Sequence, residues 1–435
     1  GPLDEVKIWV FFSDKGVLTQ DEYRKAVRDR ESALSDRTKA RRLKARAGRD
    51  IVDFFDLPVN QPYVERIEQL GARVLARSRW LNGVSVSVSA GLIPEIERLP
   101  FVREIRKVVA YRKERGLRTE KGRGFAPPRK TPLYIDYGVS WDQLEQLNVP
   151  EAHANGYTGQ GVLICMLDTG FDYMYGPHKS LLHIKNQVVA QWDFINNDPV
   201  TWYDSENDTI DARDKEQPYH GTRMLSIVAG YLNNQLIGPA FGADFALCKT
   251  EWYRDGGEDI IAEEHWWIAA SEWADSVADT LGYDRVIISS SLGYRTWEDS
   301  TDYGYVNLDG NTTPLSIGAD IAASRGILVV TAIGNVTLGN PSTRPDTCIK
   351  APADADSIIA VGGVDTAGAW AWNPDPGTGS AIGPTADGRT KPELMAAWVC
   401  VVAHPGGGDY VDSLQAVGGT SCATALVSGV SALVW

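Results

Sequence analysis

Residues 162–170, VLICMLDTG, begin with six apolar residues and end in an acidic turn. A short apolar run without polar alternation is typical of a strand that is buried on both faces. Further runs of this kind occur at 188–194, 245–248, 286–288, 327–330 and 358–361, with helical patterns between them at 220–231, 259–280 and 315–325. Buried strands that alternate with helices predict an α/β fold, in which a parallel sheet carries helices on both faces.

The first 110 residues show a different pattern. Strand-like runs lie at 6–12, 73–80, 84–88 and 102–109, and short amphipathic helices are expected at 61–70 and 92–99. The order β-α-β-β-α-β predicts a small α+β unit of the ferredoxin-like kind. Residues 19–50 are strongly charged, and we expect them to be helical and to face the solvent.

Residues 111–133 combine many basic residues with proline and glycine and hold few apolar ones. This composition is typical of an exposed linker, which is where chains are commonly cut. We therefore expect a domain at 1–110, a linker at 111–133 and a larger domain at 134–435.

Charge is distributed unevenly along the chain. Residues 1–130 carry a net charge of +11, whereas residues 131–435 carry −25. Opposite charges favour docking of the two parts, and the acidity of the larger part argues against nucleic acid as its partner. No apolar run reaches the ~20 residues that a membrane span requires, so no span is expected.

Four polar residues follow the predicted strands or begin the predicted helices. Asp168 and Asn335 each follow a buried strand, while His220 and Ser421 each begin a helical pattern. Because the working residues of a parallel sheet lie beyond the carboxyl ends of its strands, these side chains can converge on one edge. A serine becomes a nucleophile when an imidazole accepts its proton and a carboxylate orients the imidazole, and an amide can stabilise the oxyanion. The set therefore predicts nucleophilic acyl transfer.

Each of these residues also has a structural interpretation. Ser421, at the head of a run of small and apolar residues, can be a helix N-cap, and Asn335, after a glycine, can be a left-handed turn residue. Asp168 can be a turn residue, and DTG is also the signature of aspartic proteases. Those enzymes need two such carboxylates, and the chain holds no second D-[ST]-G. The other histidines are expected to be structural: His153, His178, His183, His265 and His404.

The order Asp, His, Ser, with DTG at 168–170, HGT at 220–222 and GTSCATA at 419–425, resembles the subtilisin-like serine proteases, or subtilases. Further blocks resemble that family in the same order: GYTGQGVLICMLDTGFD, HGTRMLSIVAG, SSSLGY, VVTAIGNV and GPTADGRTKPELMA. The resemblance covers roughly residues 134–435 and implies a subtilisin-like fold.

The resemblance implies a role for each of the four residues. Asp168 would orient His220, which would act as general base and then as general acid. Ser421 would be the nucleophile, and Asn335 would donate to the oxyanion together with the backbone N–H of Ser421. No cofactor would be required for this chemistry.

Two short segments would bind the substrate by the same resemblance. One would pair with the substrate backbone as an added strand: Ser291, Leu292 and Gly293. The other would form a wall of the S1 pocket: Ala332, Ile333 and Gly334.

Residues 1–110 resemble subtilase propeptides, which assist folding and then inhibit the enzyme. We expect a secreted serine endopeptidase that hydrolyses proteins or peptides through an acyl-enzyme and is made as a self-processing proenzyme, cut in or near 111–133. The start at Gly1-Pro2 suggests that a signal peptide has been removed. The alternative is an impaired protease fold that binds peptides and stays locked by its prodomain.

The match departs from the family at three places. Ala425 stands where proline is usual, which predicts softened geometry at the start of the serine helix. Cys422 follows the nucleophile directly and predicts loss of activity on oxidation or mercurial treatment. The chain ends at Trp435, although subtilase domains normally continue, so a C-terminal part is expected to be missing.

Residues 196–214, NNDPVTWYDSENDTIDARD, are dense in oxygen ligands. Structural calcium is one expectation for this segment, and a solvated acidic loop is the other. Among the five cysteines, Cys348 with Cys400 is the one disulfide considered.

Overall fold

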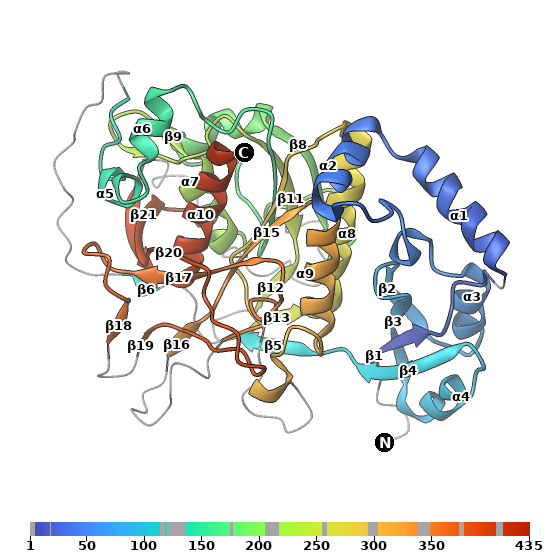
Figure 1. Cartoon of the computed structure of the whole chain (residues 1–435). Helices are drawn as coiled ribbons and strands as arrows, with labels where there is room; N and C mark the ends of the chain where they lie inside the picture. Colours follow the sequence, from blue (N-terminus) through green and yellow to red (C-terminus); the bar gives the residue numbers. More distant parts are fainter. Residues whose placement is uncertain are drawn as a thin grey trace.

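The computed structural model describes residues 5–17, 19–113, 118–119, 135–174, 177–204, 217–254, 259–294, 303–337, 349–373, 378–405 and 412–435. Figure 1 shows a small N-terminal unit, in blue, that lies beside a larger unit, and α1 runs along the outer side from the small unit towards α2. No helix within these ranges is long and apolar enough to cross a membrane.

The larger unit is organised around a seven-stranded parallel sheet with the order β20-β17-β15-β14-β7-β11-β8. Its strands are β7 (Leu163–Asp168), β8 (Val188–Asp193), β11 (Asp244–Lys249), β14 (Val286–Ser290), β15 (Leu328–Ala332), β17 (Ile359–Val364) and β20 (Leu394–Ala397). Six of them coincide with the apolar runs, so the predicted parallel sheet is confirmed. The seventh, β20, was not predicted because LMAA is short and ends in small residues.

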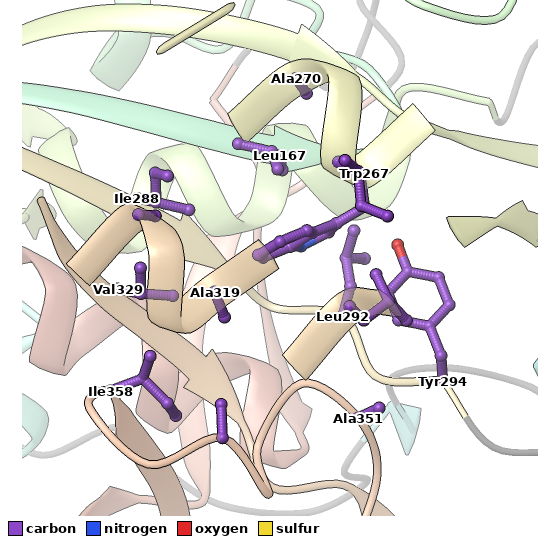
Figure 2. Packing of buried hydrophobic residues seen from close by; sticks show 14 of the residues in the cluster. Leu167, Trp267, Ala270, Ile288, Leu292, Tyr294, Ala319, Val329, Ala351 and Ile358 are labelled. Carbon is purple, nitrogen blue, oxygen red and sulfur yellow. The ribbon is translucent and has the colours of Figure 1, made fainter. Parts of the chain in front are cut away.

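Four long helices cover the two faces of this sheet. Helices α8 (Glu264–Leu281) and α9 (Pro314–Ser324) share one core cluster with Leu163, Cys165 and Leu167. Helices α7 (Tyr219–Ala229) and α10 (Thr420–Val434) share the other with Ile164 and Met166. Alternate residues of β7 thus point to opposite faces, as the period of a strand requires, and Figure 2 shows Leu167 on the side of Trp267.

The helix expected at 259–280 begins later than predicted. Residues Asp259–Glu263 form strand β13, which pairs with β12 (Glu251–Arg254), and the helix starts at Glu264. The adjacent isoleucines at 260 and 261 favour a strand because they are β-branched.

Shorter elements complete the larger unit. They are α5 (Trp141–Glu145), α6 (Val149–Ala154), η3 (Lys179–Asn186), β9 (Tyr231–Leu232), β10 (Leu236–Ile237), η4 (Tyr305–Asn307), β16 (Asn335–Thr337), β18 (Trp372–Asn373), β19 (Thr378–Ser380), β21 (Val399–Ala403) and β22 (Leu414–Gly418).

The N-terminal unit has the predicted ferredoxin-like arrangement, with an antiparallel sheet in the order β2-β3-β1-β4. Its elements are β1 (Glu5–Phe12), α1 (Gln20–Ala33), α2 (Asp36–Arg46), η1 (Phe54–Asp56), α3 (Gln61–Gln69), β2 (Arg73–Ser78), β3 (Gly83–Ser89), η2 (Ala90–Leu92), α4 (Ile93–Glu97) and β4 (Val102–Lys107). One face of the sheet packs on α3 and α4. From the other face, Trp9 and Phe11 join the core cluster of α8.

The charged segment 19–50 is helical as predicted, but the expectation that it faces the solvent is wrong for α2. Arg41 and Arg42 are only 2% and 0% exposed. They are buried because each forms an ion pair with Asp275 on α8. By contrast, none of the residues of α1, all of which the structure describes, is buried.

Two pieces of the segment expected to be a linker are strands that join sheets of the larger unit. β5 (Ala110–Lys113) pairs antiparallel with β13, and β6 (Arg118–Thr119) pairs antiparallel with β22. Residues 114–117 and 120–134 lie outside the described part of the chain.

Candidate active site

Asp168 and His220 come together where strand β7 ends and helix α7 begins. Asp168 is the last residue of β7, a fully buried strand between β14 and β11. His220 is the second residue of α7. Gly221 permits the close approach of the helix, because a Cβ there would lie 2.1 Å from the carbonyl oxygen of Gly170.

The His220 ring lies between an acid and a hydroxyl. Its Nδ1 is 2.6 Å from Asp168 Oδ1, and its Nε2 is 3.2 Å from Ser421 Oγ. The three residues are 5%, 1% and 3% exposed, respectively. Asp168 Oδ1 also accepts a hydrogen bond from the backbone N–H of Thr169 at 2.7 Å, which helps to fix the carboxylate.

Ser421 lies in the first turn of α10 but does not cap that helix. The N-cap residue is Gly419, with no side-chain cap. Ser421 Oγ instead lies 3.0 Å from the carbonyl oxygen of Ser291, a second acceptor for its hydrogen beside His220 Nε2, and Ser291 Oγ donates to the carbonyl oxygen of Ser421 at the same distance. This reciprocal pair ties the end of β14 to the start of α10. The hydroxyl therefore sits at a helix N-terminus, where negative charge is favoured.

The Asn335 side chain is held by the residue before Ser421. Its Oδ1 accepts hydrogen bonds from both the backbone N–H and the hydroxyl of Thr420, each at 2.9 Å. Because these two donors face the amide oxygen, the amide nitrogen is turned to the other side, where its two hydrogens can donate. Asn335 is the first residue of β16, which pairs with β19.

The two segments expected to bind substrate lie at the same edge of the sheet, after β14 and β15. The side chains of Leu292 and Ile333 point into the hydrophobic core and are fully buried; Figure 2 shows Leu292 against Tyr294 and below Trp267. The side chain of Ile333 is thus occupied in packing, and the role of residues 332–334 as a wall of the S1 pocket stays a prediction. What these segments can offer a substrate is their main chain.

A buried ion pair beside Asp168 was not found by sequence reasoning. Lys249, the last residue of β11, is in register with Asp168, and its Nζ lies 2.8 Å from Asp193 Oδ2. Both side chains are fully buried. Burial raises the pKa of Asp193, and the Lys249 ammonium partly offsets this effect. A lysine that ends an apolar strand was the available signal in the sequence.

The residues that depart from the family pattern are all accommodated inside the protein. Ala425 is fully buried in α10, which is continuous from Thr420 to Val434. The Cys422 thiol is also buried and donates to the carbonyl oxygen of Val417 at 3.6 Å. Cys400 is a free, buried thiol whose pKa is raised by burial, and Cys348 lies outside the described residues.

The segment expected to bind calcium is described only up to residue 204. Among the residues that the structure describes, no three His, Cys, Asp or Glu side chains gather as a metal site would need. Asp198 Oδ1 accepts from the backbone N–H of Val200 at 2.7 Å. Residues 205–214, with most of the carboxylates, lie outside the described ranges.

Comparison with known proteins identifies two regions of the chain. Residues 159–435 match the subtilase family (peptidase S8), and residues 7–121 match the family described as "Peptidase S8 propeptide domain, Bacteroidota".

Several curated relatives are bacterial proteins of low sequence identity. The chain is 25% identical to Subtilisin NAT of Bacillus subtilis subsp. natto over 371 residues, which cover 85% of this chain and 74% of the relative. It is 28% identical to Serine protease AprX of Bacillus subtilis (strain 168) over 313 residues, which cover 67% of this chain and 61% of the relative. It is 25% identical to Bacillopeptidase F of the same organism over 366 residues, which cover 81% of this chain and 22% of the relative. The chain thus spans less than two thirds of the last two relatives.

The subtilase match covers more than half of the chain and includes Asp168, His220 and Ser421. The propeptide match includes the four-stranded unit from residue 7 onwards, together with β5 and β6. The chain therefore belongs to the subtilase family, and it is a serine endopeptidase preceded by a propeptide domain.

Proposed function

We propose that Asp168, His220 and Ser421 act as a catalytic triad that hydrolyses peptide bonds through an acyl-enzyme. The observation that carries this proposal is the His220 ring, whose two nitrogens lie 2.6 Å from Asp168 Oδ1 and 3.2 Å from Ser421 Oγ. A nucleophile, a base and an orienting acid in hydrogen-bond reach are what covalent catalysis by serine requires.

Each residue has a defined task in the reaction. His220 Nε2 accepts the Ser421 hydroxyl proton as Oγ attacks the substrate carbonyl, and then delivers it to the leaving amine. Asp168 holds the Nδ1–H tautomer and stabilises the imidazolium. A water molecule repeats the sequence on the acyl-enzyme and releases the second product.

The oxyanion is stabilised by two donors in this proposal. One is the backbone N–H of Ser421, and the other is the amide nitrogen of Asn335, which Thr420 orients by occupying the amide oxygen. Such donors lower the barrier because they are in place before charge develops.

We also propose that the enzyme cuts its own chain between Lys113 and Arg118. β5 reaches Lys113 along β13, and β6 resumes at Arg118, which pairs with Gly418 on β22. Ser421 comes three residues after Gly418. The chain is thus paired as an added strand on each side of residues 114–117, as a bound substrate would be, and the second pairing ends close to Ser421 in the sequence. In this position the N-terminal unit would inhibit the enzyme, and it would assist folding beforehand.

Incubation of the parent chain beside Ser421→Ala tests the proposal. The parent is expected to release an N-terminal fragment, and N-terminal sequencing of the larger fragment should give a start between residues 114 and 118. A start elsewhere contradicts the proposed bond. Identical band patterns for parent and variant contradict self-processing.

Labelling with a fluorophosphonate separates the enzyme from the alternative, a protease fold that only binds peptides. Stoichiometric modification at Ser421 supports catalysis. A folded sample without its N-terminal fragment that takes up no label would instead favour the peptide-binding alternative.

Two further properties are part of the proposal. We propose secretion, which fractionation of the source cells would test. We propose structural calcium at residues 196–214, where carboxylates and carbonyls are abundant; the chemistry itself needs only the side chains named above. A chelator that leaves the melting temperature unchanged would favour the solvated loop.

A further inference from the structure

Residues 19–57 form an extension of the propeptide, here called the arm, that is inserted between β1 and α3. The arm has a small apolar cluster of its own, made by Leu34, Ile51 and Val52 with Val27 packed against it. This cluster is separate from the core between the four-stranded sheet and helices α3 and α4. The arm therefore is not needed to complete the core of the N-terminal unit.

Helix α8 presents acidic side chains to the N-terminal unit along one face. Glu264, Glu272, Asp275 and Asp279 fall within one side of the helix because of their spacing. The first two contact the four-stranded sheet and its β2–β3 turn: Glu264 accepts from Trp9 Nε1 at 3.0 Å, and Glu272 accepts from the backbone N–H of Trp80 at 3.2 Å.

The last two acidic residues of this face contact the arm. Asp279 accepts from the backbone N–H of Ser35 at 2.9 Å, at the start of α2. Asp275 receives two adjacent arginines of the arm: Arg41 Nη2 at 2.6 Å and Arg42 Nη2 at 2.9 Å. The arm thus has its own docking site, further along α8 than the site of the sheet.

Asp275 is the centre of this docking site. It accepts a third guanidinium, that of Arg79, at 3.0 Å. Burial alone would raise the pKa of the Asp275 carboxyl, but the charges of Arg42, Arg41 and Arg79 outweigh burial and lower it. The carboxylate is therefore charged and almost inaccessible to water, and these three guanidiniums, which form ion pairs with it, all come from the N-terminal unit.

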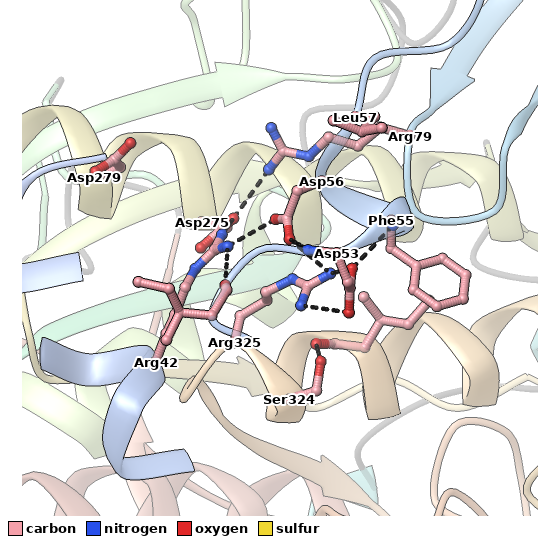
Figure 3. A network of polar contacts seen from close by, with 12 residues as sticks. Arg42, Asp53, Phe55, Asp56, Leu57, Arg79, Asp275, Asp279, Ser324 and Arg325 are labelled. Atoms are coloured by element: carbon pink, nitrogen blue, oxygen red, sulfur yellow. Dashed lines mark hydrogen bonds and ion pairs between the residues drawn. The ribbon is translucent and has the colours of Figure 1, made fainter. Parts of the chain in front are cut away.

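Arg325, at the end of α9, makes the complementary contacts. Its Nη2 lies 2.7 Å from Asp53 Oδ1 and 3.3 Å from Asp56 Oδ2, and its carbonyl oxygen accepts from Arg41 Nε at 3.0 Å. Arg42 Nη1 lies 2.7 Å from Asp56 Oδ1 and so closes the network inside the arm. Figure 3 shows this chain of contacts from Asp275 through Arg42 and Asp56 to Arg325.

We propose that Asp275 and Arg325 form a recognition site for the arm, which keeps the propeptide bound to the enzyme after the chain has been cut. The proposal rests on the proposed function, because it concerns the propeptide of a self-processing protease. Charges are exchanged in both directions: arginines of the arm pair with an acid of the enzyme, and acids of the arm pair with an arginine of the enzyme. None of these contacts involves β5, β6 or the residues around Ser421.

The site also defines which partner it accepts. A segment without the two adjacent arginines would leave the buried Asp275 carboxylate with Arg79 as its one remaining ion-pair partner among the described residues. A segment without the acids of the sequence Asp53-Phe54-Phe55-Asp56 would remove both carboxylates that contact Arg325. Uncompensated buried charges are strongly unfavourable. The site therefore selects a helix with an arginine pair followed by D-x-x-D, and the arm of this chain has both.

The experiment uses the full chain with Ser421→Ala, so that cleavage does not depend on its own activity. A site for a specific protease is introduced between residues 120 and 134, the chain is cut there, and the dissociation rate of the N-terminal fragment is measured. Arg41→Gln and Asp275→Asn are expected to raise this rate by about a hundredfold or more, since the first removes one of the three guanidiniums that neutralise Asp275 and the second removes the carboxylate that pairs with the buried Arg41.

Arg24→Gln is the matched control. Arg24 lies on α1 of the same arm, its side chain is 64% exposed, and its pair with Asp21 is 4.0 Å long. The Arg24→Gln substitution also removes one arginine, but the dissociation rate of its N-terminal fragment should stay within about twofold of the parent. Rates for Arg41→Gln and Asp275→Asn that equal that of Arg24→Gln would overturn the proposal.

A double variant guards against misfolding as the cause. If Arg41 and Asp275 contact each other, the variant with both substitutions should dissociate far more slowly than the product of the two single effects predicts. Strictly multiplicative effects would contradict a direct pair. Because no peptide bond is hydrolysed by the Ser421→Ala chain, this outcome is independent of whether the parent processes itself.

In the active parent, the same substitutions have a separate readout. Arg41→Gln should leave the rate of self-cleavage unchanged and shorten the lag before peptidase activity appears, because the inhibitory fragment leaves sooner. A lag equal to that of Arg24→Gln would count against retention by the arm. An absence of cleavage in every variant would contradict the proposed function instead.

Discussion

Two clusters of buried polar side chains differ in how much of them a sequence can reveal. The cluster of Asp168, His220 and Ser421 lies at strand and helix ends within motifs, and its three members lie in a single line of hydrogen bonds. The cluster around Asp275 joins the arm to α8 and α9 through ion pairs, and its members lie in no motif. The comparison teaches that a motif locates groups that react, whereas groups that only neutralise each other leave no such local pattern.

The largest expected effect separates the two clusters by function. Ser421→Ala should lower kcat by about a millionfold, the size known for removing the serine of subtilisin, a relative of this chain. The variant should retain the N-terminal unit, because Ser421 takes no part in the contacts around Asp275. Peptide hydrolysis and size-exclusion chromatography measure the two effects.

A smaller loss of activity is expected when the side chain that stabilises the oxyanion is removed. Asn335→Ala should lower kcat by about 10²–10³-fold with little change in KM, the size known for this donor in subtilisin. Thr420→Val is the matched control, since it removes one hydrogen bond to Asn335 Oδ1 but keeps the amide. An equal loss in both variants would mean that Asn335 acts by supporting Thr420 and not as a donor.

Acid should weaken the contacts of the arm cluster. Burial raises the pKa of Asp53, but Arg325 and Arg46 outweigh it and lower the pKa from 3.8 to about 2. The groups that face Asp53 are Arg325, Arg46, Asp56, Tyr23 and Lys15. A lowered pKa stabilises the bound arm above about pH 4, and this stabilisation is lost as the pH falls towards 2.

Acid should reduce the binding free energy of the arm by about 1–2 kcal/mol. The effect is this small because Asp53 is partly exposed and solvent screens its ion pair with Arg325. Dissociation of the cut Ser421→Ala chain, measured from pH 5 to pH 2, should accelerate about tenfold. The pKa of Glu272 shifts in the opposite direction, since burial raises it despite the charge of Arg79. Asp53→Asn should flatten the profile, and an unchanged profile would exclude Asp53 as the titrating group.

The smallest effect is expected at Cys422. The thiol is fully buried, so a mercurial should react slowly with the native enzyme and activity should persist meanwhile. Mass spectrometry should show that activity is lost only as Cys422 is modified. Full activity with Cys422 modified would remove the predicted link between this thiol and Ser421.

Much of the fold was predictable because its strands are unbroken apolar runs. Six of the seven strands of the parallel sheet and the ferredoxin-like order of the first unit were read directly, whereas β20 is too short and too small in its side chains. The helix start at Glu264 was missed, since Asp259–Glu263 continues a helical pattern in sequence but pairs as a strand.

The candidate site was predictable as a set of residues but not as a geometry. The position of Asp168, His220, Ser421 and Asn335 at element ends could be read from the sequence. The role of Thr420 in orienting Asn335, the tie between Ser291 and Ser421, and the pair of Lys249 with Asp193 could not, because they join residues far apart in the chain.

The arm marks the limit of what the sequence determined by itself. Composition established that α1 and α2 are charged helices, and periodicity established the alternating strands, since both depend on neighbouring residues. Only the tertiary structure decided that α1 stays exposed while Arg41 and Arg42 of α2 are buried. The reason is physical: a charged side chain can be buried where an opposite charge pairs with it. The carboxylate that pairs with Arg41 and Arg42 belongs to Asp275, which lies more than two hundred residues away in the sequence.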